Sequence, residues 1–357
     1  MFIVAHVGAR VWGGAERAVA RLLSGLRQRG HRVLLLCNDA VVAEPAAALG
    51  LDARILPLGG DVAVHHAARL ALELRRLRPD VLLVGMFKKT WLAGLAGRMA
   101  GVPRIVVRVG LESDVPRNGK YRFAFRHLVD HVVVVAERLA PAYEALPGYG
   151  TSRVSVIPNA VTAPARRQAD GALRASLGIR PDAPVVGAIA RLATQKRLDR
   201  LIDAVARLPE AHCVITGEGP CEHDLREQAA NAGVAERVHF LGYQPDVGDV
   251  LAAMDVFAVS SEQEGMSNAM LEALAAGIPV VSTRVSGTEE ALRADAVGVA
   301  PGVVVDFDAA ALADALRTVL ADRALCASMS AAALRRVEES FSWPAVLGAW
   351  ERALSAR

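Results

Sequence analysis

The chain has 357 residues, which is long enough for two domains. Hydrophobic residues make up 53% of it and aromatic residues only 4%, a balance typical of buried parallel strands covered by helices. The formal net charge of +3 argues against wholesale binding to nucleic acid.

The sequence offers no sign of a membrane span, a signal peptide or a disulfide framework. No apolar run reaches the roughly 18 residues that a spanning helix needs, and residues 1–7 are too short for a signal-peptide core. The cysteines are scattered without paired spacing, at Cys37, Cys213, Cys221 and Cys326. We therefore expect reduced thiols in a cytoplasmic protein.

In the first half, short apolar runs alternate with helical patterns. The runs are 2–7, 33–37, 55–58, 81–84, 105–109 and 132–135. One helix is expected after a loop that ends at Arg17, up to a stop at Gly30, and others over 67–76, 90–99 and 121–129. This alternation predicts a doubly wound α/β domain of the Rossmann-like type.

A glycine pair, Gly13 and Gly14, stands at the first strand-to-helix turn. Glycine lets a backbone approach a phosphate closely, and a helix N-terminus favours anions. With Gly8, the pair does not fit the dinucleotide fingerprint Gly-x-Gly-x-x-Gly, so a dehydrogenase is disfavoured. A plain tight turn is the alternative on these residues alone.

Three loops at strand ends in this half, 10–12, 86–91 and 108–117, could face an acceptor, and solvated loop positions are the alternative. Their candidate residues are Trp12, Lys88, Arg108 and Glu112. Segment 117–126 is basic and aromatic, which suits either a peripheral contact with the inner, anionic membrane surface or a solvated helix face. A zinc site at His127 and His131 is not expected, because no third ligand is near.

A second α/β series begins at Val185, after a polar stretch at 162–170 that reads as a linker. Its first strand, 185–190, leads into a loop with Arg191 and Lys196. Fixed cations at this point could neutralise the growing charge of a phosphate leaving group without a metal ion. Asp306 and Asp308 form a nominal Asp-x-Asp that we interpret as a loop.

The segment 255–290 is the most informative part of the chain. A short strand is followed by a helix with Ser267 or Asn268 as N-cap, and Gly277 with Pro279 ends that helix. A second strand then follows. Such a helix begins at the carboxyl end of a parallel strand, where open sheets bind ligands.

Two carboxylates frame this helix. Glu264 precedes it and Glu272 lies within it, about 12 Å further along the helix axis. This separation is too large for a shared proton or a common metal ion. It suits two hydroxyl groups on one long ligand, with a phosphate held by the amides of Gly265 to Asn268. A nucleoside-diphosphate sugar has this form, and an exposed helix with acids in its first turns is the alternative.

The motif Glu264-Gly265-Met266-Ser267-Asn268 with Glu272 resembles the paired-glutamate signature of the large retaining GT-B glycosyltransferase family. That family includes glycogen and sucrose synthases and phosphatidylinositol mannosyltransferases. Gly13-Gly14-Ala-Glu-Arg, Arg191 with Lys196, and Ile157-Pro158-Asn159 also resemble that family.

The resemblance implies two Rossmann-like domains that face each other across a cleft. The first, acceptor-side domain would span 1–163 with 342–357 crossing back to it, and the donor domain would span 164–341. It implies a metal-independent, retaining transfer from a UDP- or GDP-sugar to a glycan, lipid-linked or small-molecule acceptor. Neither a cofactor, a metal ion nor nucleic acid would take part.

The resemblance also assigns the residues. Arg191, Lys196 and the Gly13–Gly14 turn would hold the diphosphate, and Glu272 the ribose. Glu264, with the amides of Gly265, Met266, Ser267 and Asn268, would bind the sugar. Glu264, Arg191 and Lys196 would be catalytic.

One departure keeps other readings open. Many family members carry a histidine after the fifth strand, where Arg108-Val109-Gly110 stands here. The missing histidine retains a non-catalytic nucleotide-sugar binder as an alternative. A phosphorylase or epimerase of the same fold is a further alternative, because it would share the Arg, Lys and Glu set.

Overall fold

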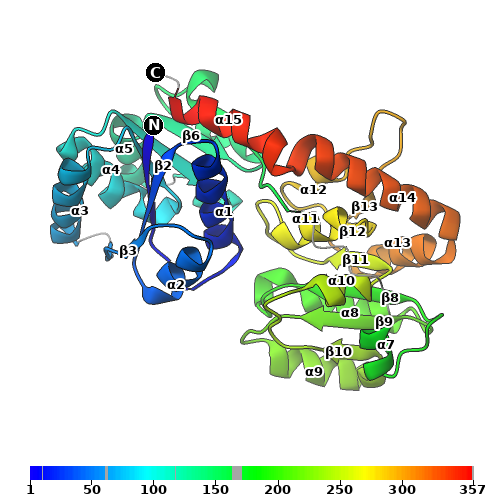
Figure 1. The fold of residues 1–357 in the computed structure, drawn as a ribbon. Helices are drawn as coiled ribbons and strands as arrows, with labels where there is room; N and C mark the ends of the chain where they lie inside the picture. The colour runs from blue at the N-terminus through cyan, green and yellow to red at the C-terminus, as the bar shows by residue number, and fades with distance from the viewer. Residues whose placement is uncertain (10, 61–62, 117, 163–170, 356–357) are drawn as a thin grey trace. The chain divides into compact units, whose positions relative to one another are not determined.

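The computed structural model describes residues 1–9, 11–60, 63–116, 118–162 and 171–355, so most of the expected linker and positions 10 and 117 lie outside the described residues. The chain divides into two compact units (Figure 1). Unit 1 comprises Met1–Asn159 with Trp343–Arg357, and unit 2 comprises Ala160–Ser342.

Unit 1 is built on a seven-stranded sheet of order β3-β2-β1-β4-β5-β6-β7, and each described strand pair is parallel. Its strands are β1 Phe2–Val7, β2 Arg32–Cys37, β3 Ala53–Ile55, β4 Val81–Val84, β5 Arg104–Val109, β6 His131–Val134 and β7 Val154–Val156. Its helices are α1 Gly14–Gln28, α2 Ala40–Ala48, α3 Val64–Leu77, α4 Thr90–Ala100, α5 Gly119–Leu128, α6 Ala140–Glu144 and α15 Trp343–Ser355.

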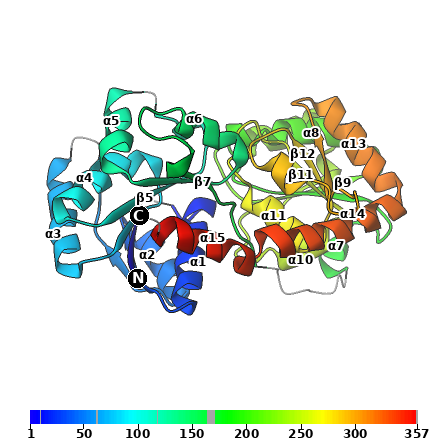
Figure 2. The ribbon, with the colours of Figure 1, turned by 90° about the horizontal axis from the view of Figure 1, so that it is seen from above.

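The C-terminal helix α15 belongs to unit 1 although it is last in the sequence. It lies beside α1 (Figure 2). Gly25 of α1 allows this close approach, because a Cβ there would lie 3.0 Å from Leu347 of α15. Arg104 on β5 donates two hydrogen bonds to the carbonyl of Ala353, which fixes the far end of the helix.

Unit 2 contains a six-stranded sheet of order β10-β9-β8-β11-β12-β13, again with parallel pairs. Its strands are β8 Val185–Ile189, β9 His212–Thr216, β10 Val238–Phe240, β11 Val256–Val259, β12 Val280–Thr283 and β13 Gly302–Val305. Its helices are α7 Ala172–Ser176, α8 Leu198–Ala206, α9 Glu222–Asn231, α10 Gly248–Ala252, α11 Asn268–Ala275, α12 Thr288–Ala291, α13 Ala309–Ala321 and α14 Arg323–Arg336.

Buried aliphatic side chains hold unit 2 together. One apolar cluster joins α8, α9 and α13 to a face of the sheet, with Leu201, Leu225 and Leu316 among its members. Gly187 on β8 leaves room for the side chain of Met254, whose sulfur would lie 1.9 Å from a Cβ at that glycine. Removing this much apolar surface from water is the main favourable term in folding such a unit.

The prediction of two doubly wound α/β domains is confirmed. The run 55–58 was placed wrongly: β3 is Ala53–Ile55, its residues are not buried, and residues 56–58 follow it outside any strand. The other predicted runs are strands because strands buried on both faces need no alternation of polar and apolar residues. The sequence patterns did not indicate α2, β13, α13 or α14.

Candidate active site

The site lies at the carboxyl edge of the sheet in unit 2. Strands β8 and β11 are neighbours there, and the strand order reverses between them. Open parallel sheets bind ligands at this kind of switch point, because the loops that leave the two strands part in opposite directions. The loop after β8 carries Arg191 and Lys196, and the loop after β11 carries Glu264.

Backbone and hydroxyl groups join these two loops. The amide of Glu262 donates to the carbonyl of Gln195 at 2.9 Å. The hydroxyl of Ser260 donates to the carbonyl of Lys196, also at 2.9 Å. Arg200 of α8 in turn donates to the carbonyl of Ser260 at 2.8 Å. The Lys196 and Glu264 loops therefore behave as one supported unit of backbone.

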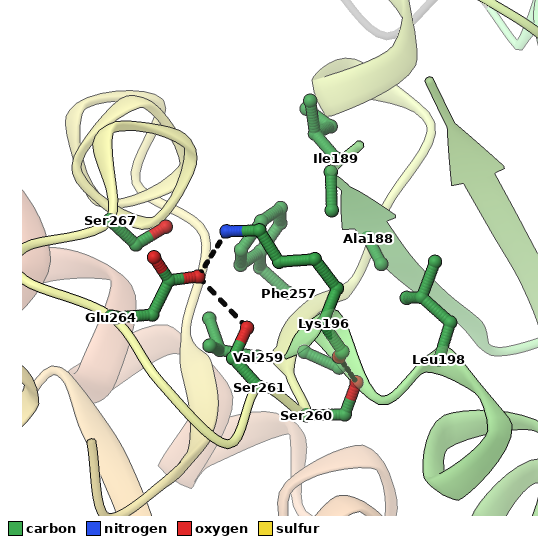
Figure 3. A pocket seen from close by; sticks show the side chains of 12 residues that line it. Ala188, Ile189, Lys196, Leu198, Phe257, Val259, Ser260, Ser261, Glu264 and Ser267 are labelled. Carbon is green, nitrogen blue, oxygen red and sulfur yellow. Dashed lines mark hydrogen bonds and ion pairs between the residues drawn. The ribbon is translucent and has the colours of Figure 1, made fainter. Parts of the chain in front are cut away.

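Lys196 and Glu264 meet above this backbone (Figure 3). The ammonium of Lys196 forms an ion pair with Oε1 of Glu264, and their side chains are 20% and 11% exposed. The hydroxyl of Ser261 donates to the same oxygen at 2.8 Å. Both groups line a pocket together with Ala190, Phe257, Ser267 and neighbouring residues of β8 and β11. A half-buried cation and carboxylate that share a pocket are suited to a ligand with both phosphate and hydroxyl groups.

Helix α11 begins beside this pair. Ser267 is its N-cap, and the Ser267 hydroxyl accepts a hydrogen bond from the amide of Met270 at 3.3 Å, as predicted. Gly277, at φ 75°, ends the helix. Asn268 and Glu272 lie on α11 and are partly buried, whereas Gly265 and Met266 are buried before it.

A glycine that the sequence motifs did not indicate supports this loop. Gly287 has a φ of 77°, and a Cβ there would lie 2.6 Å from the carbonyl oxygen of Gly265. No other residue fits that approach without a shift of backbone.

A second glycine pair closes the other side of the site. Gly217 has a φ of 131°, and a Cβ there would lie 2.0 Å from the carbonyl oxygen of Ala190. A Cβ at Gly219 would lie 2.2 Å from the carbonyl oxygen of Leu192. The Gly-x-Gly spacing after β9 was the available signal. Arg191, between those two carbonyls, is exposed.

In unit 1, Gly13 and Gly14 stand where α1 begins, with Gly13 as N-cap. The amide of Gly13 donates to Oε2 of the buried Glu16 at 3.0 Å, which satisfies a group at the helix terminus. The phosphate contact expected at this turn stays a prediction. Trp12, just before the turn, is half-buried.

Arg108 lies inside unit 1. Its side chain is 5% exposed, and Nη2 donates to Oδ1 of Asn159 at 2.6 Å. Burial lowers the pKa of Arg108 to about 10, and the nearby charges of Glu16 and Asp114 oppose that effect. The guanidinium thus holds the end of the unit, and its expected role toward an acceptor stays a prediction.

The remaining acceptor-side candidates differ in their surroundings. Lys88 is exposed, and the neighbouring Lys89 turns back to donate to the carbonyls of Leu58 and Gly59 at 2.9 and 2.8 Å. Glu112 opens a short 3-10 turn, Glu112–Asp114, after β5. Lys88 and Glu112 also remain candidates by position only.

The Asp-x-Asp motif and the histidine pair have structural partners in the folded chain. Asp308 caps α13 by accepting from the amide of Ala311 at 2.9 Å. His131 opens β6, where its Nε2 lies 2.8 Å from the hydroxyl of Ser155. Within the described ranges, no group of three His, Cys, Asp or Glu side chains could hold a metal ion. Nor does any helix described here have the length and apolar character to cross a membrane.

Comparisons with known proteins agree with the fold of the two units. Residues 170–336 match the family "Glycosyl transferases group 1", and residues 12–163 match "Glycosyltransferase Family 4". The chain is 30% identical to the lipopolysaccharide core biosynthesis glycosyltransferase LpsE of Rhizobium meliloti, over 97% of this chain and 96% of that protein. It is also 30% identical to a 2-deoxystreptamine N-acetyl-D-glucosaminyltransferase of Streptomyces fradiae, over 87% of this chain and 83% of that protein.

Among solved structures, HepE of Anabaena in complex with UDP aligns over 100% of both chains with a TM-score of 0.87 and 20% sequence identity. At that identity the likeness concerns the fold, which is the GT-B fold of two Rossmann-like domains. The identity to LpsE extends over almost the full length of both proteins, and so it reaches both halves of the chain. The chain belongs to the GT-B glycosyltransferases of the group 1 family.

Proposed function

We propose that this glycosyltransferase moves a sugar from a nucleoside diphosphate to a hydroxyl group of a glycan, lipid-linked or small-molecule acceptor. The observation that carries the proposal is the Lys196–Glu264 pair at the switch point of the unit 2 sheet. A cation and a carboxylate on bonded loops can receive the phosphate and the sugar hydroxyls of one donor. The HepE structures, which contain UDP or UDP-glucose, support this class of donor.

Each donor group has a proposed partner in unit 2. Arg191 and Lys196 receive the diphosphate, and Glu272 accepts from the ribose hydroxyls. Glu264 accepts from a hydroxyl of the sugar, beside the backbone of residues 265–268. Among the residues that the structure describes, both contacts of the Glu264 carboxylate fall on Oε1, which leaves Oε2 to meet the sugar.

The reaction follows from these roles. The bond between the sugar C1 and the phosphate oxygen breaks, and a bond forms between C1 and the acceptor oxygen. The acceptor's proton passes to the leaving phosphate oxygen, so the protein supplies no base and the configuration at C1 is retained. Arg191 and Lys196 stabilise the charge that grows on the diphosphate, which is why we propose a metal-independent transfer.

The names of two relatives favour one of the proposed classes of acceptor. LpsE and LpsD of Rhizobium meliloti each align over 97% of this chain and 96% of their own length, and both are named for lipopolysaccharide core biosynthesis. We therefore favour a lipid-linked saccharide over a small molecule, although a 2-deoxystreptamine enzyme also aligns well.

The first test is thermal unfolding with UDP, GDP, ADP and CMP, each with and without EDTA. A ligand at about 100 times its dissociation constant adds about 2.7 kcal/mol of stability, which shifts the melting temperature by a few degrees. We expect one nucleoside diphosphate to act, and EDTA to change nothing. A shift that requires a divalent ion would contradict the metal-independent proposal.

Product analysis separates the alternatives. Incubation with the matching nucleotide sugar and a core saccharide should give a glycosylated product, whose anomeric proton coupling reports retention. Binding without transfer to any acceptor would favour a non-catalytic binder. Conversion of the donor without an acceptor sugar would favour an epimerase or phosphorylase.

A peripheral contact with an anionic membrane is a second proposal, and it rests on α5. Arg122, Phe123 and Arg126 are exposed on this helix, and Phe123 is 50% exposed while contacting the rings of Trp91 and His127. Basic side chains around an aromatic ring favour an anionic lipid surface. When vesicles of phosphatidylglycerol are sedimented, the wild type should be found with the vesicles and Phe123→Ser should remain in the supernatant. Equal amounts of both proteins with the vesicles would contradict this role.

A further inference from the structure

We propose that Ser261 is the positioning residue for the Glu264 carboxylate, and that it alone keeps this carboxylate oriented once the donor's diphosphate has drawn Lys196 away. The inference deepens the proposed function and rests on it. It assigns a role to a buried hydroxyl group, which the sequence motifs did not indicate, in recognition of the donor's sugar.

Within the described part of the chain, two groups hold Oε1 of Glu264, and they differ in mobility. Lys196 reaches the carboxylate with a flexible four-carbon stem and a charge that any nearby phosphate attracts. Ser261 reaches it with one rotatable bond, from a position two residues beyond the end of β11. Figure 3 shows both groups converging on one carboxylate oxygen from different sides.

The backbone that carries Ser261 is itself fixed. The hydroxyl of Thr283, at the end of β12, donates to the carbonyl of Ser261 at 2.6 Å. Ser261 is 3% exposed and Thr283 is 0% exposed. A buried hydroxyl is costly unless it is hydrogen-bonded, and the short distances here show that both hydroxyls are satisfied by these contacts.

Arrival of a diphosphate changes the balance between the two groups. A diphosphate has more negative charge than one carboxylate, so it competes for the Lys196 ammonium at close range. Ser261 has no charge and no freedom to follow, so its hydrogen bond to Oε1 persists. Oε2 then faces the sugar in the orientation that Ser261 sets.

This assignment separates two ligands that differ only by the sugar. Removing the Ser261 hydroxyl should weaken the binding of a nucleotide sugar and leave the binding of the bare nucleoside diphosphate unchanged. A general packing defect would weaken both ligands together. The ratio of the two dissociation constants is therefore the informative quantity.

The experiment is titration calorimetry of wild type and Ser261→Ala with UDP and UDP-glucose, and in parallel with GDP and GDP-mannose. We expect Ser261→Ala to lose about tenfold in affinity for the nucleotide sugar that the wild type binds, and less than about twofold for its nucleoside diphosphate. Ser261→Thr keeps the hydroxyl and should stay within about threefold of wild type for both ligands.

Ser260→Ala is the matched control. Ser260 is a neighbouring buried serine, but its hydroxyl donates to the backbone of Lys196 rather than to Glu264. Whatever Ser260→Ala does to affinity, the ratio between the two ligands should change by less than about twofold.

The outcomes distinguish the inference from the function beneath it. Equal losses for both ligands in Ser261→Ala, or a loss in Ser261→Thr as large as in Ser261→Ala, would overturn the role of Ser261 while leaving a donor site in place. A wild type that binds none of the four ligands would overturn the proposed function, and the inference with it.

Discussion

The two units have the same strand order around β1 and β8, yet the charged residues at their carboxyl edges serve different ends. In unit 2, Lys196 and Glu264 pair with each other over a pocket. In unit 1, Glu16 accepts from the amide of Gly13, and Arg108 donates to the side chain of Asn159. Lys89, which follows β4, donates to the backbone carbonyl of Leu58. The unit 2 pair consists of two opposite charges beside a pocket, so a ligand can replace either partner. The unit 1 charges have neutral partners within the folded chain, and they hold its loops together.

This difference explains why one topology can supply two kinds of edge. The Lys196–Glu264 pair is only 20% and 11% exposed, but it borders a pocket, so the phosphate of a ligand can replace Glu264 as the partner of the ammonium. A buried cation that has lost its hydrogen-bond partner costs several kcal/mol. We therefore expect substitutions of the charged residues at the unit 2 edge to change mainly activity, and substitutions of the charged residues at the unit 1 edge to change mainly stability.

The largest expected effect is at Glu264. Glu264→Ala should lower kcat/KM by about 10²- to 10³-fold, because it removes a contact that positions the transferred sugar. The melting temperature should fall by only a few degrees, because Lys196 can turn toward the pocket while the buried Ser261 hydroxyl loses its acceptor. Glu264→Gln keeps the shape, and it should recover only part of the rate. Steady-state kinetics with near-normal turnover in Glu264→Ala would remove its role.

A pair of lysines tests the comparison directly. Lys196→Ala should lower kcat/KM about 100-fold with little change in stability, because its charge serves the ligand. Lys89→Ala should do the reverse: two carbonyls, those of Leu58 and Gly59, lose their donor, which costs about 1–3 kcal/mol of unfolding free energy. Chemical denaturation and kinetics on both variants provide the measurement. The same profile in both would break the contrast between the edges.

Gly217 should be needed for both stability and binding. Gly217→Ala brings a Cβ to the carbonyl oxygen of Ala190 at a left-handed φ, so the loop before Arg191 must shift. We expect a loss of about 2–3 kcal/mol of unfolding free energy and weaker donor binding. Gly30→Ala is the control, because φ of Gly30 is also positive but a Cβ there would have no atom within 4 Å. It should cost about 1 kcal/mol.

The smallest expected effect is a pH dependence in unit 1. His6 is buried on β1, and burial lowers its pKa to about 4, with the charge of Lys89 contributing. The unfolded chain binds a proton near pH 6.5, so the folded state binds fewer protons between about pH 6.5 and 4. Stability is therefore complete above that window and is lost as the pH falls.

Linkage gives the size of this loss as about 2 kcal/mol between about pH 7 and pH 5. His6→Gln should flatten the pH dependence of unfolding in urea by that amount. His127→Gln, on the exposed face of α5, is the control and should leave the curve unchanged. A parallel curve for wild type and His6→Gln would mean that His6 does not titrate in this way.

Much of the fold could be predicted because its signals are local. Apolar runs such as 2–7 and 81–84 mark strands buried on both faces, and Ser267 with Gly277 marks the two ends of α11. Helix α2 was not predicted: its N-cap Asp39 was the available signal, but residues Ala40–Ala48 include Pro45 and lack an apolar stripe at helical spacing.

The carboxyl edge of the unit 2 sheet was predictable in part. Arg191, Lys196 and Glu264 each follow a strand, and the strand order brings Lys196 and Glu264 to one pocket. Their direct pairing and the contact of Ser261 with Glu264 depend on side-chain rotamers, which no sequence spacing specifies. The close approaches at Gly217 and Gly287 depend on neighbouring loops in the same way.

The carboxyl edge of the unit 1 sheet was less predictable, because Lys89 and Arg108 donate to residues far away in the sequence. Arg108 and Asn159 are far apart in sequence, and nothing in either segment indicates that their side chains meet. Burial of Arg108 makes it a different kind of residue from the exposed Lys88, although both follow strands in the same half.

The central claim is that the Lys196–Glu264 edge binds a nucleoside-diphosphate donor without a metal ion. Titration calorimetry of wild type and Lys196→Ala with UDP and GDP, in the presence of EDTA, tests it most directly. The account predicts that one of the two nucleotides binds the wild type in EDTA and binds Lys196→Ala at least about tenfold more weakly. Equal affinity in both proteins, or binding that appears only when a divalent ion is added, would contradict it.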